Sequence, residues 1–321
     1  MSCYFVTGCA GFIGSNLVDR LLSDGHDVVG YDNFSTGRQE FLSKAYQYSA
    51  FRMVDGDLLD TEKLAKAMAA QSVDVVFHLA ANADISRGPE RPRRDLEQNT
   101  IATFNLLDSM RRTDARRIVF SSTGSIYGEP KVFPTPEDAP FPVQTSLYGA
   151  SKLAGEGLIS AFCESFGFQS WIYRFVSVLG ERYTHGHVFD FFRKLRNNPH
   201  AIDVLGDGCQ TKSYMYVGDC ISGMLAGLES KSAKVNIFNL GTDETIQVKD
   251  SLTLIVGRLG LSPEVRYAGG PRGWVGDSPM IHLDCSRLRT LGWAPALSIR
   301  TSVLRTLDWL VENDWVYEGD K

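Results

Sequence analysis

Short apolar runs alternate with amphipathic stretches through the first half of the chain. The runs have the length and residue types of buried strands and lie at 4–6, 28–31, 51–54, 73–79, 118–120 and 170–175. The stretches between them carry apolar residues at helical spacing, which predicts helices at 12–22, 61–70, 95–112 and 148–166. This alternation predicts an α/β fold with a doubly wound parallel sheet, whose ligands bind at the carboxyl ends of the strands.

The alternation loosens after residue 175, where a second region begins. An amphipathic stretch at 188–196 is followed by a helix-like segment at 220–228 and an apolar run at 235–240. We expect a first domain over 1–175 that is rejoined by about 214–240. The remainder, 176–213 and 241–321, is expected to form a smaller mixed α/β lobe.

Composition narrows the class of protein. The 321 residues carry a formal net charge of −5, and 43% of them are hydrophobic, so a sizeable core is available and the overall charge does not indicate a nucleic-acid or membrane-surface binder. We find no uninterrupted apolar segment of about 18 residues and no cleavable leader pattern. The six cysteines are scattered without a Cys-x-x-Cys pair. These features predict a cytoplasmic protein with reduced thiols.

Three glycines separate the first apolar run from the first amphipathic stretch. Gly8, Gly11 and Gly14 permit a tight turn and close approach of the backbone to a pyrophosphate, which the start of the next helix also favours. The second run ends at Asp32, whose carboxylate would accept a hydrogen bond from the adenosine 2′-hydroxyl and repel a 2′-phosphate. The segment predicts a Rossmann-type domain that binds NAD in preference to NADP.

Tyr148 and Lys152 stand four residues apart and therefore lie on one face of a predicted helix. A neighbouring ammonium favours the phenolate, so we expect the pKa of Tyr148 to be lowered toward neutrality and the phenol to act as a general base. Thr123 ends the preceding strand, at the carboxyl edge where the cofactor is expected. Its hydroxyl is predicted to hydrogen-bond the reacting hydroxyl of the substrate.

An ordered set of motifs over nearly the whole chain resembles the extended short-chain dehydrogenase/reductases, and within them the nucleotide-sugar 4-epimerases of the UDP-glucose/UDP-galactose type. The motifs are Thr7-Gly8-Cys9-Ala10-Gly11-Phe12-Ile13-Gly14, Tyr31-Asp32-Asn33, Gly56-Asp57-Leu58, His78-Leu79-Ala80-Ala81, Ser121-Ser122-Thr123, Tyr127-Gly128 and Tyr148-Gly149-Ala150-Ser151-Lys152. Two later segments, 206–219 and 272–277, look like the family's nucleotide-diphosphate lobe.

The resemblance implies a role for each matching position. The implied catalytic residues are Thr123, Tyr148 and Lys152. The implied cofactor-binding residues are Gly8, Gly11, Phe12, Ile13, Gly14, Asp32, Asn33, Asp57, Leu58, Leu79, Ala80, Ala81, Asn99, Ser121, Tyr148, Lys152 and Phe175. The implied substrate-binding residues are Thr123, Ser125, Ser177, Val188, Phe189, Lys212, Arg272 and Asp277. The implied assembly is a homodimer formed through the helices that begin near residues 95 and 148.

The implied activity is inversion of C4 in a nucleotide-diphosphate sugar. Tyr148 would remove the proton of the 4-hydroxyl as hydride passes to NAD, and hydride would return to the opposite face of the 4-keto sugar. A net oxidation or reduction of a nucleotide sugar stays open as an alternative. A non-catalytic NAD sensor is disfavoured because the catalytic set is intact. Gly124 and Ser125 follow Thr123 where the family's dehydratases have Asp-Glu, which argues against dehydration.

Two positions depart from the family pattern. Ser177 stands where an Asn that contacts substrate is usual, so the sugar cannot be named from the motif. Lys212 stands where an Arg is frequent, giving a point charge instead of a planar fork. We still expect Lys212 and Arg272 to neutralise the substrate diphosphate.

Other polar side chains receive structural interpretations. His185 and His187 lie in a Gly-containing loop without a third ligand at a recognised spacing, so we predict no metal site. His78 lies inside an apolar run and is predicted to be a buried, hydrogen-bonded histidine. Cys9 is interpreted as a small filler within the glycine turn.

Overall fold

The computed structural model describes residues 1–83, 88–141, 143–230, 233–274 and 276–318. Residues 1–126, 147–174 and 224–238 form one compact unit. Residues 127–146, 175–223 and 239–321 form a second unit. The elements of each unit are described in turn below.

A seven-stranded sheet in the order β11-β6-β5-β4-β1-β2-β3 organises the first unit. Its strands are β1 (Cys3–Thr7), β2 (Asp27–Asp32), β3 (Phe51–Asp55), β4 (Val75–His78), β5 (Arg117–Thr123), β6 (Gln169–Phe175) and β11 (Val235–Leu240). The pairs β1–β2, β2–β3, β1–β4 and β4–β5 are parallel. The chain runs outward from β1 to β3 and then restarts on the other side at β4, so the direction of winding reverses between β1 and β4. The predicted α/β, doubly wound fold class is confirmed.

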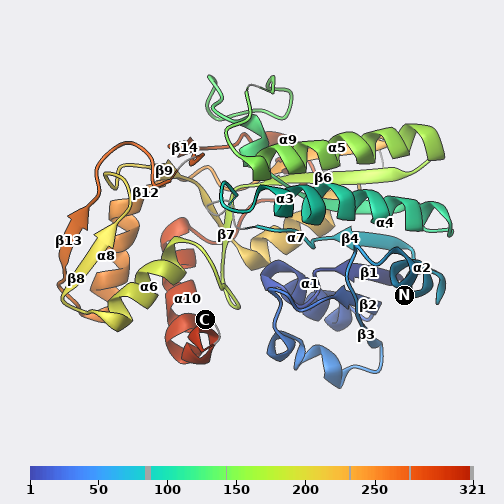
Figure 1. The fold of residues 1–321 in the computed structure, drawn as a ribbon, viewed down its shortest axis with the longest axis horizontal. Helices are drawn as coiled ribbons and strands as arrows, with labels where there is room; N and C mark the ends of the chain where they lie inside the picture. Colours follow the sequence, from blue (N-terminus) through green and yellow to red (C-terminus); the bar gives the residue numbers. More distant parts are fainter. Residues whose placement is uncertain (84–87, 142, 231–232, 275, 319–321) are drawn as a thin grey trace. The chain divides into compact units, whose positions relative to one another are not determined.

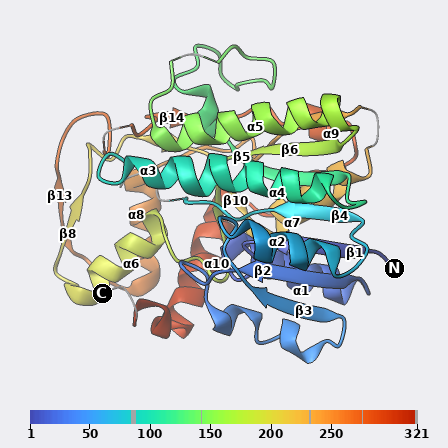
Figure 2. The ribbon, with the colours of Figure 1, turned by 45° about the vertical axis from the view of Figure 1, so that its right-hand side comes forward.

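Helices cover both faces of this sheet. On one face α2 (Thr61–Ala69), α4 (Ala102–Arg111) and α5 (Leu147–Phe166) pack side by side, as Figure 1 shows. Helix α1 (Phe12–Ser23) packs on β1 and β2 from the opposite face (Figure 2). The apolar core between the sheet and the first group of helices includes Phe5, Leu106 and Phe120, each fully buried. Two short 3₁₀ segments, η1 (Gln39–Leu42) and η2 (Ala45–Gln47), follow β2.

The helix predicted at 95–112 is interrupted in the structure. It begins as α3 (Pro92–Asp95), passes through a π-helical turn η3 (Leu96–Ile101) and continues as α4. A π-helical turn widens the helix by one residue and is frequent at functional sites. Hydrophobic spacing alone does not reveal it, and the apolar side chains of Leu96, Ile101 and Phe104 are exposed in the structure.

The second unit combines helices with short strands. Its helices α6 (His187–Asn197), α8 (Val248–Leu259) and α10 (Ile299–Glu312) pack on one another. Two strand pairs are parallel, β7 (Ser177–Leu179) with β10 (Tyr214–Tyr216) and β8 (Ala201–Val204) with β13 (Glu264–Tyr267). A third small sheet has the order β12 (Ile246–Gln247), β9 (Thr211–Lys212), β14 (Met280–Ile281). The remaining elements are η4 (Gly124–Tyr127), α7 (Val217–Leu228), α9 (Ser286–Arg289) and η5 (Asp314–Tyr317).

Across the parts of the chain that the structure describes, no helix combines the length and apolar character needed to traverse a membrane.

Candidate cofactor and active site

The glycine turn lies at the carboxyl end of β1, where the sequence places it. The Gly8 amide donates to the Tyr31 carbonyl at 2.9 Å, and the Gly11 amide donates to the Gly8 carbonyl at 3.1 Å. Helix α1 begins at Phe12 with Gly11 as its N-cap. The first amides of α1 and the positive end of its dipole therefore lie beside the winding reversal, which is the position for binding a pyrophosphate.

The three glycines differ in why they lack a side chain. A Cβ at Gly14 would lie 2.0 Å from the Gly8 carbonyl oxygen, and a Cβ at Gly8, where φ is +69°, would lie 2.6 Å from the Ala80 amide nitrogen. At Gly11 the nearest described atom would be the Gly8 oxygen at 3.3 Å, which a shift of a few tenths of an ångström relieves. The protein's own packing requires Gly8 and Gly14. Packing gives a weaker reason for glycine at position 11, and its contact with a pyrophosphate stays a prediction.

Asp32 ends β2 beside this turn. Its Oδ2 accepts from the Ala10 amide and its Oδ1 accepts from the Phe34 amide, both at 2.9 Å. The carboxylate is buried, and burial raises its pKa above the ordinary value for aspartate although the two amides oppose this. Each carboxylate oxygen has further acceptor capacity, so the side chain can also receive a ribose hydroxyl.

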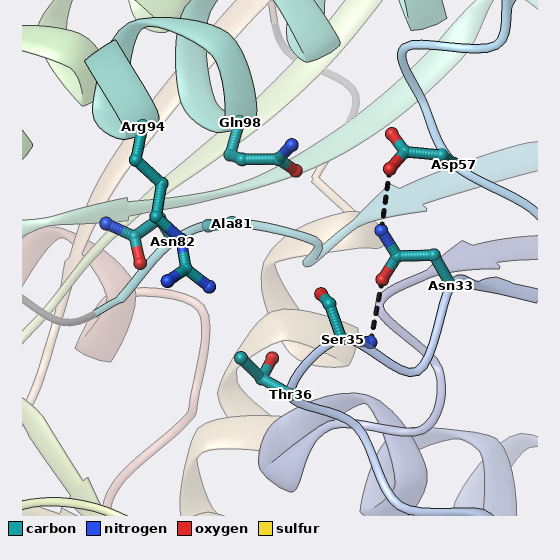
Figure 3. Close-up of a pocket in the computed structure, with 8 residues that line it drawn as sticks. All are labelled: Asn33, Ser35, Thr36, Asp57, Ala81, Asn82, Arg94 and Gln98. Atoms are coloured by element: carbon teal, nitrogen blue, oxygen red, sulfur yellow. Dashed lines mark hydrogen bonds between the residues drawn. The ribbon is translucent and has the colours of Figure 1, made fainter. Parts of the chain in front are cut away.

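A pocket of about 170 Å³ opens beside Asn33 and Asp57, and Figure 3 shows its walls. Asn33 Nδ2 donates to Asp57 Oδ2 at 2.8 Å, which fixes both side chains at the carboxyl ends of β2 and β3. The other residues lining the pocket are Ser35, Thr36, Ala81, Asn82, Arg94 and Gln98. The predicted residues Asn33, Asp57 and Ala81 are therefore brought together. Leu58 is buried in the apolar core, and its cofactor role stays a prediction.

The sequence interpretation missed two pocket residues on the helical segment above it. Arg94 belongs to α3 and Gln98 to the π-helical turn; in Figure 3 the Arg94 side chain points down from its helix, and the Gln98 side chain extends sideways toward Asn33 and Asp57. Their four-residue spacing places them on one helix face, which was a usable signal.

A hydrogen-bonded chain through His78 joins the glycine turn to the π-helical turn. Thr7 Oγ1 lies 2.8 Å from His78 Nδ1, and Thr103 Oγ1 lies 2.9 Å from His78 Nε2. Thr103 in turn donates to the Asn99 carbonyl. His78 is fully buried, and burial lowers its pKa to about 3, so the ring is neutral. This agrees with the interpretation of His78 as a buried, hydrogen-bonded histidine.

We expect the neutral His78 ring to make stability depend on pH. Its pKa is about 3 in the folded chain and near 6.5 when unfolded, so its contribution is complete above pH 6.5 and is lost as the pH falls toward 3. At pH 5 the free energy of unfolding should be lower than at pH 7 by about 2 kcal/mol from this group. Urea unfolding of the wild type and of His78→Asn measures it. An equal pH dependence in both proteins would contradict the assignment.

The predicted nicotinamide side of the site is held by further internal hydrogen bonds. Asn99 Oδ1 accepts from the Asn82 amide at 2.8 Å, and Asn99 Nδ2 donates to Ser151 Oγ at 2.9 Å. Ser121 Oγ donates to the His78 carbonyl at 3.1 Å. Asn99 thus connects the π-helical turn with the helix that carries Tyr148 and Lys152. Its role and that of Ser121 as cofactor ligands stay predictions.

Thr123, Tyr148 and Lys152 converge in the first unit. Tyr148 and Thr123 form a side-chain hydrogen bond, and Lys152 lies one helical turn after Tyr148 on α5, with its Nζ 4.3 Å from the centre of the Phe120 ring. Ser125 supports Thr123, because its amide donates to Thr123 Oγ1 at 3.1 Å. The predicted catalytic set is therefore assembled at the carboxyl end of β5.

The expected lowering of the Tyr148 pKa is wrong. Burial raises the pKa of Tyr148 to about 12, the Thr123 hydrogen bond lowers it, and the Asp95 carboxylate raises it further. Lys152 is itself buried, and its pKa is lowered to about 7. Burial disfavours both charged forms, and this outweighs the mutual attraction that the four-residue spacing suggests.

In the second unit, both predicted diphosphate ligands are paired with carboxylates. Lys212 forms a buried ion pair with Asp277 and lies over the Trp274 ring at 5.1 Å from its centre. Arg272 Nη1 donates to the Asp277 carbonyl at 2.8 Å, and its Nη2 pairs with Glu129. Lys212, Arg272 and Asp277 are thus brought together, as expected for one binding site.

The other predicted substrate ligands of this unit differ in exposure. Ser177, at the start of β7, is exposed, whereas Val188 and Phe189 are buried on the apolar side of α6. The Phe189 ring stacks on Tyr317 at 4.3 Å. Phe175, predicted to contact the cofactor, is also buried. His187 Nε2 lies 2.8 Å from Ser251 Oγ, which gives this ring a structural partner.

Comparison with known proteins agrees with this geometry. Residues 4–241 match the family model described as "NAD dependent epimerase/dehydratase family". A UDP-glucose 4-epimerase of Mycolicibacterium smegmatis is 35% identical, over 91% of this chain and 93% of the relative.

Two solved structures share the fold. One is a UDP-glucose 4-epimerase of Thermotoga maritima with UDP-glucose, with a TM-score of 0.88 and 30% identity over 97% of this chain and 99% of that one. The other is a UDP-glucuronic acid 4-epimerase of Bacillus cereus with UDP-glucuronic acid and NAD, with a TM-score of 0.88 and 28% identity over the same shares. The match to the family model and the full-length relative together place this chain in the NAD dependent epimerase/dehydratase family.

Proposed function

We propose that this chain is an NAD-dependent epimerase that inverts C4 of a nucleotide-diphosphate sugar through a 4-keto intermediate. The observation that carries this is the hydrogen-bonded Thr123–Tyr148 pair, with Lys152 one turn further along α5. It lies in the same unit as a glycine turn that is shaped for a pyrophosphate. The relatives described above are 4-epimerases of UDP-sugars, which supports the same reaction.

The first unit fits NAD by its own residues. Phe12 and Ile13 supply amides at the start of α1, Asp32 and Asn33 face the adenosine ribose, and Asp57 flanks the adenine. Bound NAD would accept a hydride from C4 of the sugar and return it. Leu79, Ala80 and Ala81 line the nicotinamide half, and Lys152 donates to its ribose. We assign this cofactor role to residues 1–175 with about 214–240.

The proton of the 4-hydroxyl is handled by the chain. Tyr148 takes this proton as phenolate in the oxidation and returns it in the reduction, while Thr123 donates a hydrogen bond that holds the reacting oxygen. The Tyr148 phenol is protonated at neutral pH because its pKa is about 12. The charged Lys152 ammonium and the positive charge of oxidised nicotinamide both favour the phenolate, so binding is expected to lower that pKa.

The remaining segments, 176–213 and 241–321, are proposed to hold the nucleotide sugar. Lys212 and Arg272 supply two positive charges for the diphosphate, although each is paired with a carboxylate in this structure. Entry of a diphosphate would then have to displace Glu129 from Arg272 or bind beside the pair. Ser125 and Ser177 offer hydroxyls to the sugar.

A substrate panel tests the proposed function. Purified protein is incubated with UDP-glucose, UDP-N-acetylglucosamine and UDP-glucuronate, and the sugars are separated by chromatography. At least one 4-epimer should form, without net change in NADH absorbance. Stoichiometric NADH formation would support a dehydrogenase instead. The absence of any epimer from UDP-, GDP-, CDP- and dTDP-sugars would exclude the proposal.

A homodimer is proposed from the outer surface of the first unit. Apolar side chains are exposed along α4, α5 and the turn before α4: Leu96, Ile101, Phe104, Leu147 and Phe166. Exposed apolar surface of this kind favours association with a second copy of the chain. Light scattering should give the dimer mass, and Phe104→Glu should shift it toward the monomer. A wild-type monomer at micromolar concentration would contradict the proposal.

We also propose a cytoplasmic location, which is supported by six cysteines that are all free thiols.

A further inference from the structure

A buried carboxylate lies beneath the catalytic helix and is not used by the reaction as described above. Glu156 is on α5, four residues after Lys152, and is almost completely buried. Arg174 donates to it through Nη2 at 2.8 Å and Nε at 3.1 Å, and the Ser122 hydroxyl also donates to it. The carboxylate is therefore held by three donors from two strands, with Ser122 on β5 and Arg174 on β6.

A buried ion pair of this kind adds little to the free energy of unfolding. A buried ion pair loses much of its attraction to the cost of desolvating both charges, so packing alone would favour apolar residues at these positions. Ser122 directly precedes Thr123, and Glu156 lies one helical turn from Lys152. Glu156 is thus one turn from Lys152 on α5, and its partner Ser122 is the chain neighbour of Thr123.

The groups that face Lys152 come from three strands and its own helix. The neutral His78 ring lies on β4, the Phe120 ring lies on β5 at 4.3 Å from Nζ, and Arg174 on β6 is paired with Glu156. Tyr148, on α5, is protonated, and the Asp95 carboxylate acts on Tyr148. Burial lowers the pKa of Lys152 to about 7, and the negative charge of Glu156 opposes this lowering. Among the groups named here, Glu156 is therefore the acid that acts on Lys152.

We propose that Glu156 is a positioning residue that keeps the buried Lys152 side chain protonated, while Ser122 and Arg174 hold the Glu156 carboxylate in place. The inference rests on the proposed function, because it assumes that a charged Lys152 donates to the nicotinamide ribose and favours the Tyr148 phenolate. It predicts that the charge of Glu156, and not only its shape, controls the alkaline limit of cofactor binding.

The test is the pH dependence of NAD affinity in Glu156→Gln, measured by calorimetry between pH 6 and 9. Affinity should fall above the pH at which Lys152 loses its proton. In Glu156→Gln this limb should move at least one pH unit lower, so that NAD binds about tenfold more weakly at pH 8 than in the wild type. Glu156→Asp keeps the negative charge, so its limb should lie close to the wild-type position. Ser122→Ala removes a neutral partner while Arg174 still holds the carboxylate, so the limb should move much less than in Glu156→Gln.

Folding is controlled separately, because Glu156→Gln leaves Arg174 buried without its carboxylate. If that variant does not fold, the double variant Glu156→Gln/Arg174→Gln removes both charges. Its limb of NAD affinity should move in the same direction, by a smaller amount. A folded variant that lacks the Glu156 charge but keeps the wild-type limb overturns the inference. Wild-type NAD binding and epimerisation, measured first, test the proposed function independently.

Discussion

Tyr148→Phe should abolish epimerisation while NAD remains bound. Phenylalanine keeps the ring in its half-buried position but cannot take or return the proton of the 4-hydroxyl. Loss of a positioned acid–base group lowers kcat by about 10²–10⁴-fold. The glycine turn, Asp32 and Lys152 are unchanged, so NAD affinity should stay within a few-fold of the wild type. The measurements are epimer formation by chromatography and NAD binding by calorimetry.

A matched control for Tyr148→Phe is available in the second unit. The Tyr216 hydroxyl donates to Glu181 Oε2 at 2.8 Å, so Tyr216→Phe removes one hydrogen-bonded phenol hydroxyl that is not among the proposed catalytic, cofactor-binding or substrate-binding residues. That variant should keep activity within about twofold, at a stability cost of about 1 kcal/mol. Residual activity near the wild-type level in Tyr148→Phe would remove Tyr148 from the proposed reaction.

Gly11→Val and Gly14→Ala should fail in different ways, although both change the same turn. Gly11 has φ −78° and ψ 177°, an extended conformation that valine adopts readily, and a Cβ there meets protein only at 3.3 Å. Gly11→Val should therefore keep its fold and lose NAD binding by at least about 100-fold, because the side chain fills the place of the pyrophosphate. Gly14→Ala places a Cβ 2.0 Å from the Gly8 oxygen and should lower stability by about 3 kcal/mol or more.

Thermal unfolding and NAD calorimetry on both glycine variants separate these effects. A midpoint close to wild type with no bound NAD is the result expected for Gly11→Val. NAD retention by that variant would mean that the pyrophosphate lies elsewhere. A Gly14→Ala protein as stable as wild type would show that the turn tolerates a shift of its backbone.

Local patterns predicted the framework of the first unit well. The strands at 4–6, 28–31 and 118–120 lie within β1, β2 and β5, because apolar runs of this length record burial on both faces of a parallel sheet. The glycine spacing placed the turn before α1 for a similar reason, since its backbone shape is fixed within seven residues. The family, the NAD cofactor and the epimerase reaction were likewise predicted from ordered motifs.

Burial was much harder to infer from the sequence. The raised pKa of Tyr148 and the lowered pKa of Lys152 both arise from desolvation by distant segments, which outweighs the four-residue spacing. The same applies to Val188, which was predicted to contact substrate and lies in the apolar side of α6. Its contribution to the site stays a prediction.

By itself, then, the sequence determined the sheet, the glycine turn, Asp32 and the Tyr148–Lys152 pair, because each depends on residues close together in the chain. Only the tertiary structure decided which side chains surround them. Glu156 meets Ser122 across 34 positions, and Lys212 meets Asp277 across 65. Such contacts follow from how the strands and loops pack, and packing sets the local dielectric that decides which of these groups are charged.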